Sequence, residues 1–282
     1  MTRRVKATVR PANERMSRIA SRFESLSRRS EKALIAYVMA GDPSLEKTEE
    51  LVIALEEAGA DLIELGVPFS DPVADGPVIQ KAGERALKER VSLRKILGMV
   101  ARLRTRTQVP MILMTYLNPV LRLGVDAFFC QAAKAGVDGV IVPDLPAEEG
   151  DALRSLAGRE GIDLIFLAAP TTEPSRLRHV AEMSSGFLYY VSVTGITGAS
   201  LSDLAQIEKR VSAIKKRSRL PVAVGFGIST PEQAQALGRV ADGIVVGSAI
   251  VRLIERYGQS PELISAVKQF VRSLKAGLKS HQ

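Results

Sequence analysis

Short apolar runs alternate with longer amphipathic segments along most of the chain. A strand that is covered on both faces needs a continuous apolar run, whereas a half-exposed strand alternates polar and apolar residues. Runs of this kind separated by helical patterns are typical of βα units around a parallel sheet. The pattern predicts eight strands, at residues 34–39, 61–65, 111–114, 139–142, 164–167, 187–191, 222–225 and 243–246.

Eight buried strands favour an α/β fold with a single closed (β/α)₈ barrel, the TIM barrel, because closure covers both faces and leaves no edge. The alternative is an open doubly wound sheet, which usually has fewer strands and often a Gly-x-Gly-x-x-Gly turn after the first one. Here the first predicted strand is followed by Ala40-Gly41-Asp42-Pro43. Helices are expected between the strands, among them 45–58, 93–105, 125–135, 147–160 and 201–216.

One phrase recurs where a helix gives way to a strand. Residues 57–61 read Glu-Ala-Gly-Ala-Asp and residues 134–138 read Lys-Ala-Gly-Val-Asp. A glycine that ends the helix, followed by entry into the next strand, is what repeated barrel units require.

The region before the first strand divides into two parts. Four apolar residues at helical spacing predict an amphipathic helix that covers the bottom of the barrel: Met16, Ile19, Phe23 and Leu26. Residues 1–13 hold four bases and almost no large apolar side chain, which predicts a disordered extension before a barrel domain at 14–282. An organelle transit peptide is the alternative, although Glu14 and Glu24 interrupt its acid-poor pattern.

Length and charge then narrow the function classes. The 282 residues suit one barrel of roughly 250 residues. The chain has 39 basic and 31 acidic residues, of which nine and two fall within the first 30. Of the net charge of +8, seven units therefore belong to the amino-terminal region, and the rest of the chain is nearly neutral. A whole-protein electrostatic case for nucleic-acid binding therefore fails.

Cysteine and apolar content indicate the compartment. Cys130 is the only cysteine, which excludes an intrachain disulfide and a cysteine-based metal cluster within one subunit. No stretch reaches the roughly 18 apolar residues of a membrane span, and the start lacks a secretory signal. We expect a cytoplasmic protein without membrane association.

Two carboxylates follow the second predicted strand. Ile63 and Leu65 should point to the helices, so Glu64 should face the barrel mouth, where apolar walls raise the pKa of a carboxyl group. Such a group can give and take a proton near neutral pH. Asp75 lies eleven residues later in a loop, where solvent favours the ionised form of a base. The plainer alternatives are a paired structural Glu64 and an Asp75 that caps the next helix, and Asp71 reads as a turn former.

Small residues follow the last three strands. The glycines of 225–229 and 247–249 come after strands seven and eight, where loops and a short helix often bind phosphate. Ser248 is expected to open that helix and to add a hydroxyl donor. The Thr/Gly segment 194–198 after strand six predicts a loop able to close over a ligand, with an ordinary loop as the alternative.

Metal and cofactor chemistry find little support. His179 and His281 stand alone, and both are expected on the surface. The glycines lie too late for a dinucleotide-binding turn, and no Gly-x-x-x-x-Gly-Lys-Ser/Thr motif occurs. We expect neither a metal nor an organic cofactor.

Taken together, these segments closely resemble the tryptophan synthase α chain family. The resemblance is carried, in order and at compatible spacing over about residues 16 to 260, by segments 37–43, 64–77, 113–116, 142–146, 194–198, 225–229 and 247–251. It implies a lyase that cleaves indole-3-glycerol phosphate to indole and glyceraldehyde 3-phosphate without a cofactor. It also implies a pyridoxal-phosphate β chain as partner, in an α2β2 heterotetramer that belongs to tryptophan biosynthesis.

The resemblance also implies roles for individual residues. Glu64 shuttles the protons of indole C3 and the side-chain hydroxyl, while Asp75 accepts from the indole N–H and is bonded by Thr197 of the mobile loop. The other implied contacts are Tyr37, Tyr189 and Phe226 around the ligand, and Gly198, Gly227, Gly247 and Ser248 at the phosphate. Three residues near strand ends are candidates for the indole pocket and equally for barrel core: Leu113, Ile141 and Leu167.

Two other functions remain open from the residues alone. Another phosphate-binding barrel, such as a sugar-phosphate isomerase or epimerase, would also place carboxylates near a shared phosphate site. A non-catalytic barrel that only activates a partner would not need Glu64 and Asp75 together.

Overall fold

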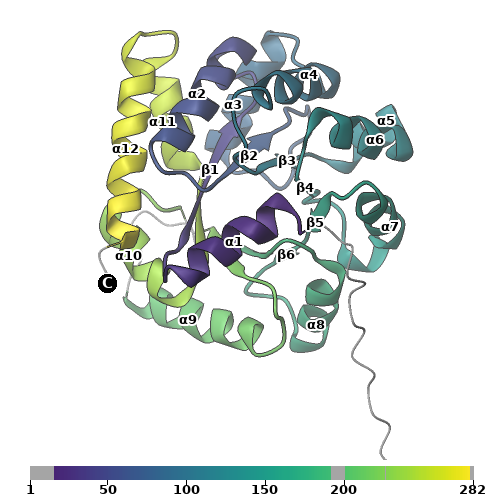
Figure 1. The fold of residues 1–282 in the computed structure, drawn as a ribbon, viewed down its shortest axis with the longest axis vertical. Helices are drawn as coiled ribbons and strands as arrows, with labels where there is room; N and C mark the ends of the chain where they lie inside the picture. Colours follow the sequence, from purple (N-terminus) through teal and green to yellow (C-terminus); the bar gives the residue numbers. More distant parts are fainter. Residues whose placement is uncertain (1–15, 192–200, 226, 280–282) are drawn as a thin grey trace, which may run out of the picture.

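The computed structural model describes residues 16–191, 201–225 and 227–279. Within them, one sheet of nine parallel strands has the order β5-β4-β3-β2-β1-β9-β8-β7-β6. The strands are β1 (Ala33–Met39), β2 (Leu62–Gly66), β3 (Met111–Met114), β4 (Gly139–Ile141), β5 (Asp163–Ile165), β6 (Leu167–Ala168), β7 (Leu188–Val191), β8 (Val222–Gly225) and β9 (Gly243–Val246). The two ends of this order, β5 and β6, are consecutive in the chain, so the sheet closes into a barrel (Figure 1).

The prediction of eight strands needs one correction. The fifth predicted strand, 164–167, is two short strands separated by Phe166. The N–H of Phe166 donates to Ser184 Oγ (3.2 Å) instead of to a strand. As a result β5 pairs with β4 and β6 pairs with β7, which joins the two edges of the sheet.

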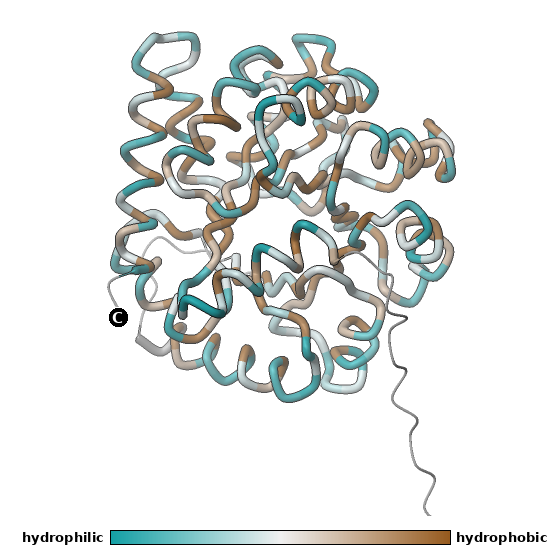
Figure 2. The backbone as a smooth tube through the Cα atoms, in the orientation of Figure 1, coloured by the Kyte–Doolittle hydropathy of each residue, from teal (hydrophilic) through white to brown (hydrophobic). Residues whose placement is uncertain are grey.

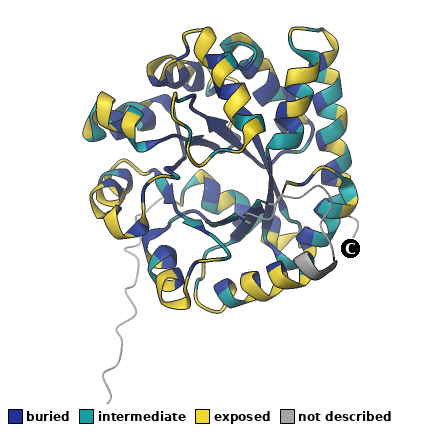
Figure 3. Ribbon diagram, turned by 180° about the vertical axis from the view of Figure 1, so that it is seen from behind, coloured by how far each residue is buried: buried dark blue, intermediate teal, exposed yellow. Residues whose placement is uncertain are grey.

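Helices surround the barrel, with their polar faces outward (Figures 2 and 3). They are α1 (Arg18–Arg28), α2 (Leu45–Glu57), α3 (Pro77–Lys88), α4 (Leu93–Leu103), α5 (Leu117–Leu123), α6 (Val125–Ala135), η1 (Ala147–Glu149), α7 (Asp151–Arg159), α8 (Pro174–Met183), α9 (Leu201–Lys215), α10 (Pro231–Val240), α11 (Ser248–Tyr257) and α12 (Glu262–Lys279). The helix predicted at 147–160 breaks at Gly150, where an added Cβ would lie 2.5 Å from Phe166 Cζ.

Helix α1 crosses the bottom of the barrel, as the sequence predicted (Figure 1). Ile19, Phe23 and Leu26 are buried in one apolar cluster with the lower strand residues. Met16 does not belong to this face: the Ser17 side chain accepts from Ala20 N and starts the helix after it, and Met16 is 47% exposed. The extension at 1–13 lies outside the described residues.

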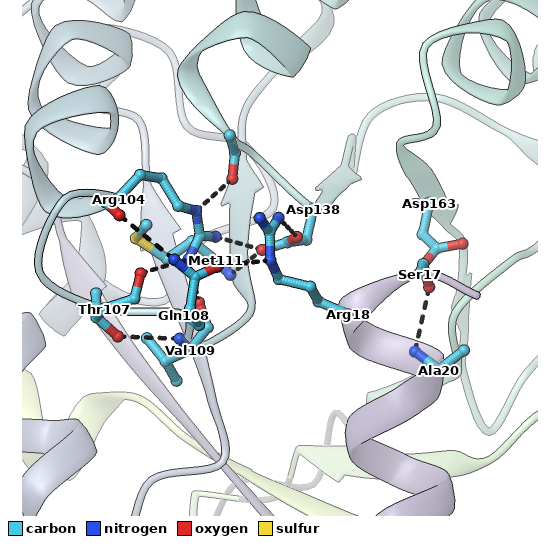
Figure 4. Close-up of polar contacts among 11 residues, drawn as sticks. Ser17, Arg18, Ala20, Arg104, Thr107, Gln108, Val109, Met111, Asp138 and Asp163 are labelled. Carbon is cyan, nitrogen blue, oxygen red and sulfur yellow. Dashed lines mark hydrogen bonds and ion pairs between the residues drawn. The ribbon is translucent and has the colours of Figure 1, made fainter. Parts of the chain in front are cut away.

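The repeated glycine and aspartate phrase ties α1 to the barrel. Asp138, which precedes β4, accepts from Met111 N of β3 (2.8 Å), and Arg18 of α1 donates to it (2.8 Å) together with Arg104 (Figure 4). Asp61 before β2 likewise accepts from Leu34 N (2.7 Å). Each aspartate therefore satisfies an amide of the neighbouring strand, which no strand partner reaches at the barrel edge.

Strand residues alternate between two apolar clusters. Ile63 and Leu65 of β2 pack in the cluster shared with the surrounding helices, whereas Leu62 packs in the barrel interior directly above α1. The interior alternation continues upward through Glu64 and Gly66, so the carboxyl ends of the strands present their polar groups at the mouth opposite α1.

Candidate active site

Glu64 lies inside the barrel, as predicted. Its neighbours Ile63 and Leu65 face the helices, and in the sheet it pairs with Tyr37 on one side and Ile112 on the other. The side chain is only 1% exposed, and its Oε2 atom has no hydrogen-bond partner among the described residues. A paired structural carboxylate would have its oxygens satisfied, so this alternative is not supported.

Burial controls the protonation of Glu64. Desolvation, and after it the nearby Asp75 carboxylate, raises the pKa of Glu64 to about 8. Glu64 therefore carries a proton at neutral pH, which is the state a general acid needs. The expected direction of the shift is confirmed.

Asp75 differs in part from the expectation. Burial raises its pKa to about 6, while a hydrogen bond from the Tyr116 hydroxyl opposes that rise. The carboxylate is half-buried instead of solvated, yet it remains mostly ionised at neutral pH. Helix α3 is capped at Gly76 without a side-chain bond, so Asp75 is not the helix cap that the alternative required.

Tyr116 contacts the loop that carries Asp75, a role that the sequence did not predict. It belongs to segment 113–116, one of those that carry the family resemblance. Its hydroxyl oxygen accepts from Ala74 N (3.0 Å), and its ring stacks on Phe69 with centroids 5.2 Å apart. It therefore holds both ends of the loop that carries Asp75. The sequence feature that could have predicted this role is an aromatic residue two positions beyond the end of β3, at the same rim as Glu64.

Tyr37 and Tyr189 lie in the barrel interior near the candidate carboxyl groups, Tyr37 near both and Tyr189 near Glu64. Burial comes first among the causes that raise the pKa of both hydroxyls, followed by Asp75 and Glu64 for Tyr37 and by Glu64 for Tyr189. Glycines leave the space for these rings. An added Cβ at Gly66 would lie 2.1 Å from Tyr37 Oη, and one at Gly225 would lie 2.8 Å from Tyr189 Cε2.

The predicted phosphate elements lie beside these tyrosines. Helix α11 begins at Ser248, as expected, and its cap Gly247 lies against Tyr37, since an added Cβ would be 3.4 Å from Tyr37 Cβ. Gly227 follows β8 with a φ of 58° and open space where a Cβ would be. The first amides of α11 lack acceptors within the helix, and the helix dipole favours an anion there.

The three candidates for the indole pocket lie on different sides of the sheet. Leu113 is completely buried in the cluster between strands and helices, so its placement in the pocket is wrong. The alternation of the strand puts Ile112 and Met114 inside instead. Ile141 and Leu167 do lie in the interior cluster, where Leu167 is only partly buried and Ile141 is fully buried.

Several expectations fall outside the described residues, namely Thr197, Gly198 and Phe226. In the described ranges, His179 lies half-buried on α8, and no group of three or more His, Cys, Asp or Glu side chains could hold a metal ion. None of the helices in those ranges has both the length and the apolar character needed to cross a membrane.

Comparisons with known proteins identify the family. The family model described as tryptophan synthase alpha chain matches residues 23–279. The chain is 52% identical over 265 residues to the tryptophan synthase alpha chain of Geotalea uraniireducens (strain Rf4), covering 94% of this chain and 99% of the relative. It is 53% identical over 263 residues to that of Citrifermentans bemidjiense, covering 93% and 98%.

Solved structures give the same result. Tryptophan synthase subunit alpha from Legionella pneumophila str. Paris superposes with a TM-score of 0.87 at 40% identity, over 94% of this chain and 99% of that one. A chain of the ligand-free M. tuberculosis tryptophan synthase has a TM-score of 0.84 at 36% identity, over 93% and 99%. This chain therefore belongs to the tryptophan synthase α chain family.

Proposed function

We propose that this lyase cleaves indole-3-glycerol phosphate with Glu64 and Asp75 as its acid–base pair. The observation that carries the proposal is the buried Glu64 carboxyl, which has an unpaired oxygen and faces the barrel mouth beside a second carboxylate. A buried polar atom without a hydrogen bond costs free energy unless a ligand supplies the partner. Such an atom therefore indicates a binding site, because polar groups in an ordinary protein core are hydrogen-bonded.

The reaction needs four proton movements. Glu64, protonated at neutral pH, donates to indole C3, and the ionised Asp75 accepts the N–H proton as positive charge develops on the ring. The Glu64 carboxylate then takes the proton of the side-chain hydroxyl. The carbonyl of glyceraldehyde 3-phosphate forms, the carbon–carbon bond breaks and its electrons return to the ring, and Asp75 gives the proton back to the ring nitrogen, so that neutral indole leaves and Asp75 is ionised again. Glu64 ends protonated, ready for the next turnover.

The remaining roles support binding and orientation. The amides at Gly247 and Ser248 are proposed to hold the phosphate, together with Gly227, which follows β8, and Gly198, which follows β7 in the sequence. Tyr37, Tyr189, Ile141 and Leu167 are proposed to line the indole pocket with Phe226, and Thr197 to bond Asp75 on loop closure. A pyridoxal-phosphate β chain in an α2β2 assembly and a cytoplasmic location complete the proposal, the latter supported by the single cysteine.

The test is Glu64→Gln, assayed by indole release from indole-3-glycerol phosphate. We expect turnover to fall by about 10²- to 10⁴-fold, because general acid–base catalysis contributes on that order, while inorganic phosphate still binds. Glu24→Gln on α1 is the matched control and should leave turnover unchanged. Activity of Glu64→Gln within about threefold of wild type would exclude Glu64 as the proton donor. An intact wild-type protein that releases no indole would favour an isomerase or epimerase.

A further inference from the structure

The proposed base, Asp75, lies immediately before the cap residue of helix α3. Asp75 lies two residues before Pro77, and Gln80 Nε2 of α3 donates to the carbonyl oxygen of Asp75 (2.8 Å). Ile79 N and Gln80 N both donate to Gly76 O (3.0 Å). The position of Asp75 therefore follows the position of α3.

Arg85, at the opposite end of α3, joins this helix to two other elements. Its Nε and Nη2 atoms donate to Asp42 Oδ1 and Oδ2, both at 2.8 Å, in the loop that follows β1. Its Nη1 atom donates to Glu255 Oε1 of α11 (3.0 Å). Asp42 is 1% exposed, and the hydrogen bond to it comes first among the causes that raise the pKa of Arg85.

Helix α11 is the element whose first turn is proposed to bind phosphate. Between α3, α11 and β1 lies a small apolar cluster made of Tyr37, Met39, Ala82, Ala86 and Val251. Tyr37 of this cluster also lies against Gly247, the cap of α11. Val251 in the first turn of α11 thus packs in one cluster with Ala82 and Ala86 of α3, and Arg85 joins the same two helices through Glu255 near the end of α11.

We propose that Arg85 is a positioning residue that couples phosphate binding at the start of α11 to the placement of the Asp75 carboxylate at the start of α3. A planar guanidinium held by two parallel bonds fixes direction as well as distance, so α3 cannot rotate without breaking them. A phosphate that orders α11 therefore also restrains α3, through the hydrogen bond from Arg85 to Glu255. The inference rests on the proposed phosphate site and on Asp75 as the base.

The experiment follows amide hydrogen exchange of Ile79 and Gln80 by NMR, with and without inorganic phosphate. In wild type we expect phosphate to slow exchange of both amides by about fivefold or more, the lower end of ordinary site-to-site coupling. Glu255→Ala cuts only the arm to α11 and leaves the buried Asp42 pair intact. In this variant the effect of phosphate should fall below about twofold.

A matched control is available in another part of the ring. Arg102 of α4 donates to Glu49 of α2 through Nε (2.9 Å) and Nη2 (2.6 Å), the same kind of bond between two helices, and neither helix carries a proposed site residue. Glu49→Ala should leave the phosphate effect at its wild-type value. A full phosphate effect in Glu255→Ala, or none in wild type, would overturn the coupling.

Kinetics give a second readout. Arg85→Met should lower kcat for indole release by about tenfold or more, with Arg85→Lys intermediate because an ammonium makes no bidentate pair. If Arg85→Met leaves Asp42 unpaired and does not fold, Asp42→Asn combined with Arg85→Met removes the buried charge, and the same loss is expected. An unchanged kcat in the folded variant would refute the proposal. Exchange coupling in a wild-type protein that releases no indole would count against the proposed function and leave the coupling standing.

Discussion

At the scale of single residues, two carboxyl groups at one rim differ because their surroundings differ. Among the described residues no donor reaches Glu64 Oε2, and the side chain is buried, so the neutral form prevails. Asp75 receives the Tyr116 hydroxyl and stays partly open to solvent, so its pKa rises less. One acid and one base at neutral pH are the outcome.

This difference predicts a bell-shaped dependence of turnover on pH. Activity should rise as Asp75 loses its proton at about 6 and fall as Glu64 loses its proton at about 8, with a maximum between them. Values of kcat/KM for indole release, measured from pH 5 to pH 9, report the free enzyme and follow both limbs. A profile with no alkaline limb would contradict a protonated Glu64 as donor.

Tyr116→Phe tests how Asp75 is held. Removing the hydroxyl removes a hydrogen bond that lowers the Asp75 pKa, so the acid limb should move to higher pH by roughly half a unit or more, while the alkaline limb stays in place. The ring and its stacking on Phe69 remain. If the acid limb does not move, the hydroxyl does not set the charge of Asp75.

At the scale of elements, the aspartates before the strands hold the bottom of the barrel. The Asp138 carboxylate is buried and is shared by one backbone amide and two arginines from different elements. This network, shown in Figure 4, explains why the phrase at 57–61 recurs at 134–138. The aspartates of the repeated segment hold neighbouring strands and α1 together at the end of the barrel opposite the site.

Asp138→Ala should therefore cost stability without changing the chemistry. Removing one partner of a buried ion pair costs roughly 3–5 kcal/mol in the free energy of unfolding, measured by urea denaturation. The matched control is Glu148→Ala, which removes an exposed pair with Arg176 and should leave the free energy of unfolding nearly unchanged. The kcat of folded Asp138→Ala should match wild type. A loss under about 1 kcal/mol would show that the network does not bear on folding.

At the scale of the whole molecule, α1 closes the barrel and the basic extension precedes it. A chain that begins at residue 14 should keep its free energy of unfolding within about 0.5 kcal/mol and its turnover unchanged, because residues 1–13 hold almost no apolar surface to bury.

A chain that begins at residue 31 is the contrasting variant. It loses three buried apolar side chains worth about 1.5–3 kcal/mol each, a sum comparable with the stability of an ordinary domain, so it should not fold stably. Urea unfolding and indole release measure both chains. A marked loss of stability in the first, or none in the second, would contradict the division made at residue 14.

The local pattern of apolar and polar residues was sufficient to locate the strands along the chain. Continuous apolar runs located every strand within a residue or two, because a strand covered on both faces cannot hide polar side chains. The same alternation placed Glu64 inside the barrel, and the glycines after strands seven and eight located the start of α11. The pattern could not reveal the split at Phe166, whose N–H donates to Ser184 Oγ, 18 residues later in the chain.

The sequence by itself determined the βα order, the helix beneath the barrel and which carboxyl groups stand at strand ends, since these follow from local periodicity and composition. Only the tertiary structure decided that Leu113 faces the helices, that Tyr116 holds Asp75, and that Arg85 joins α3 to α11. The reason is physical: burial, pKa and ion pairing depend on which distant segments come together in space. Closure of the barrel brings these segments together.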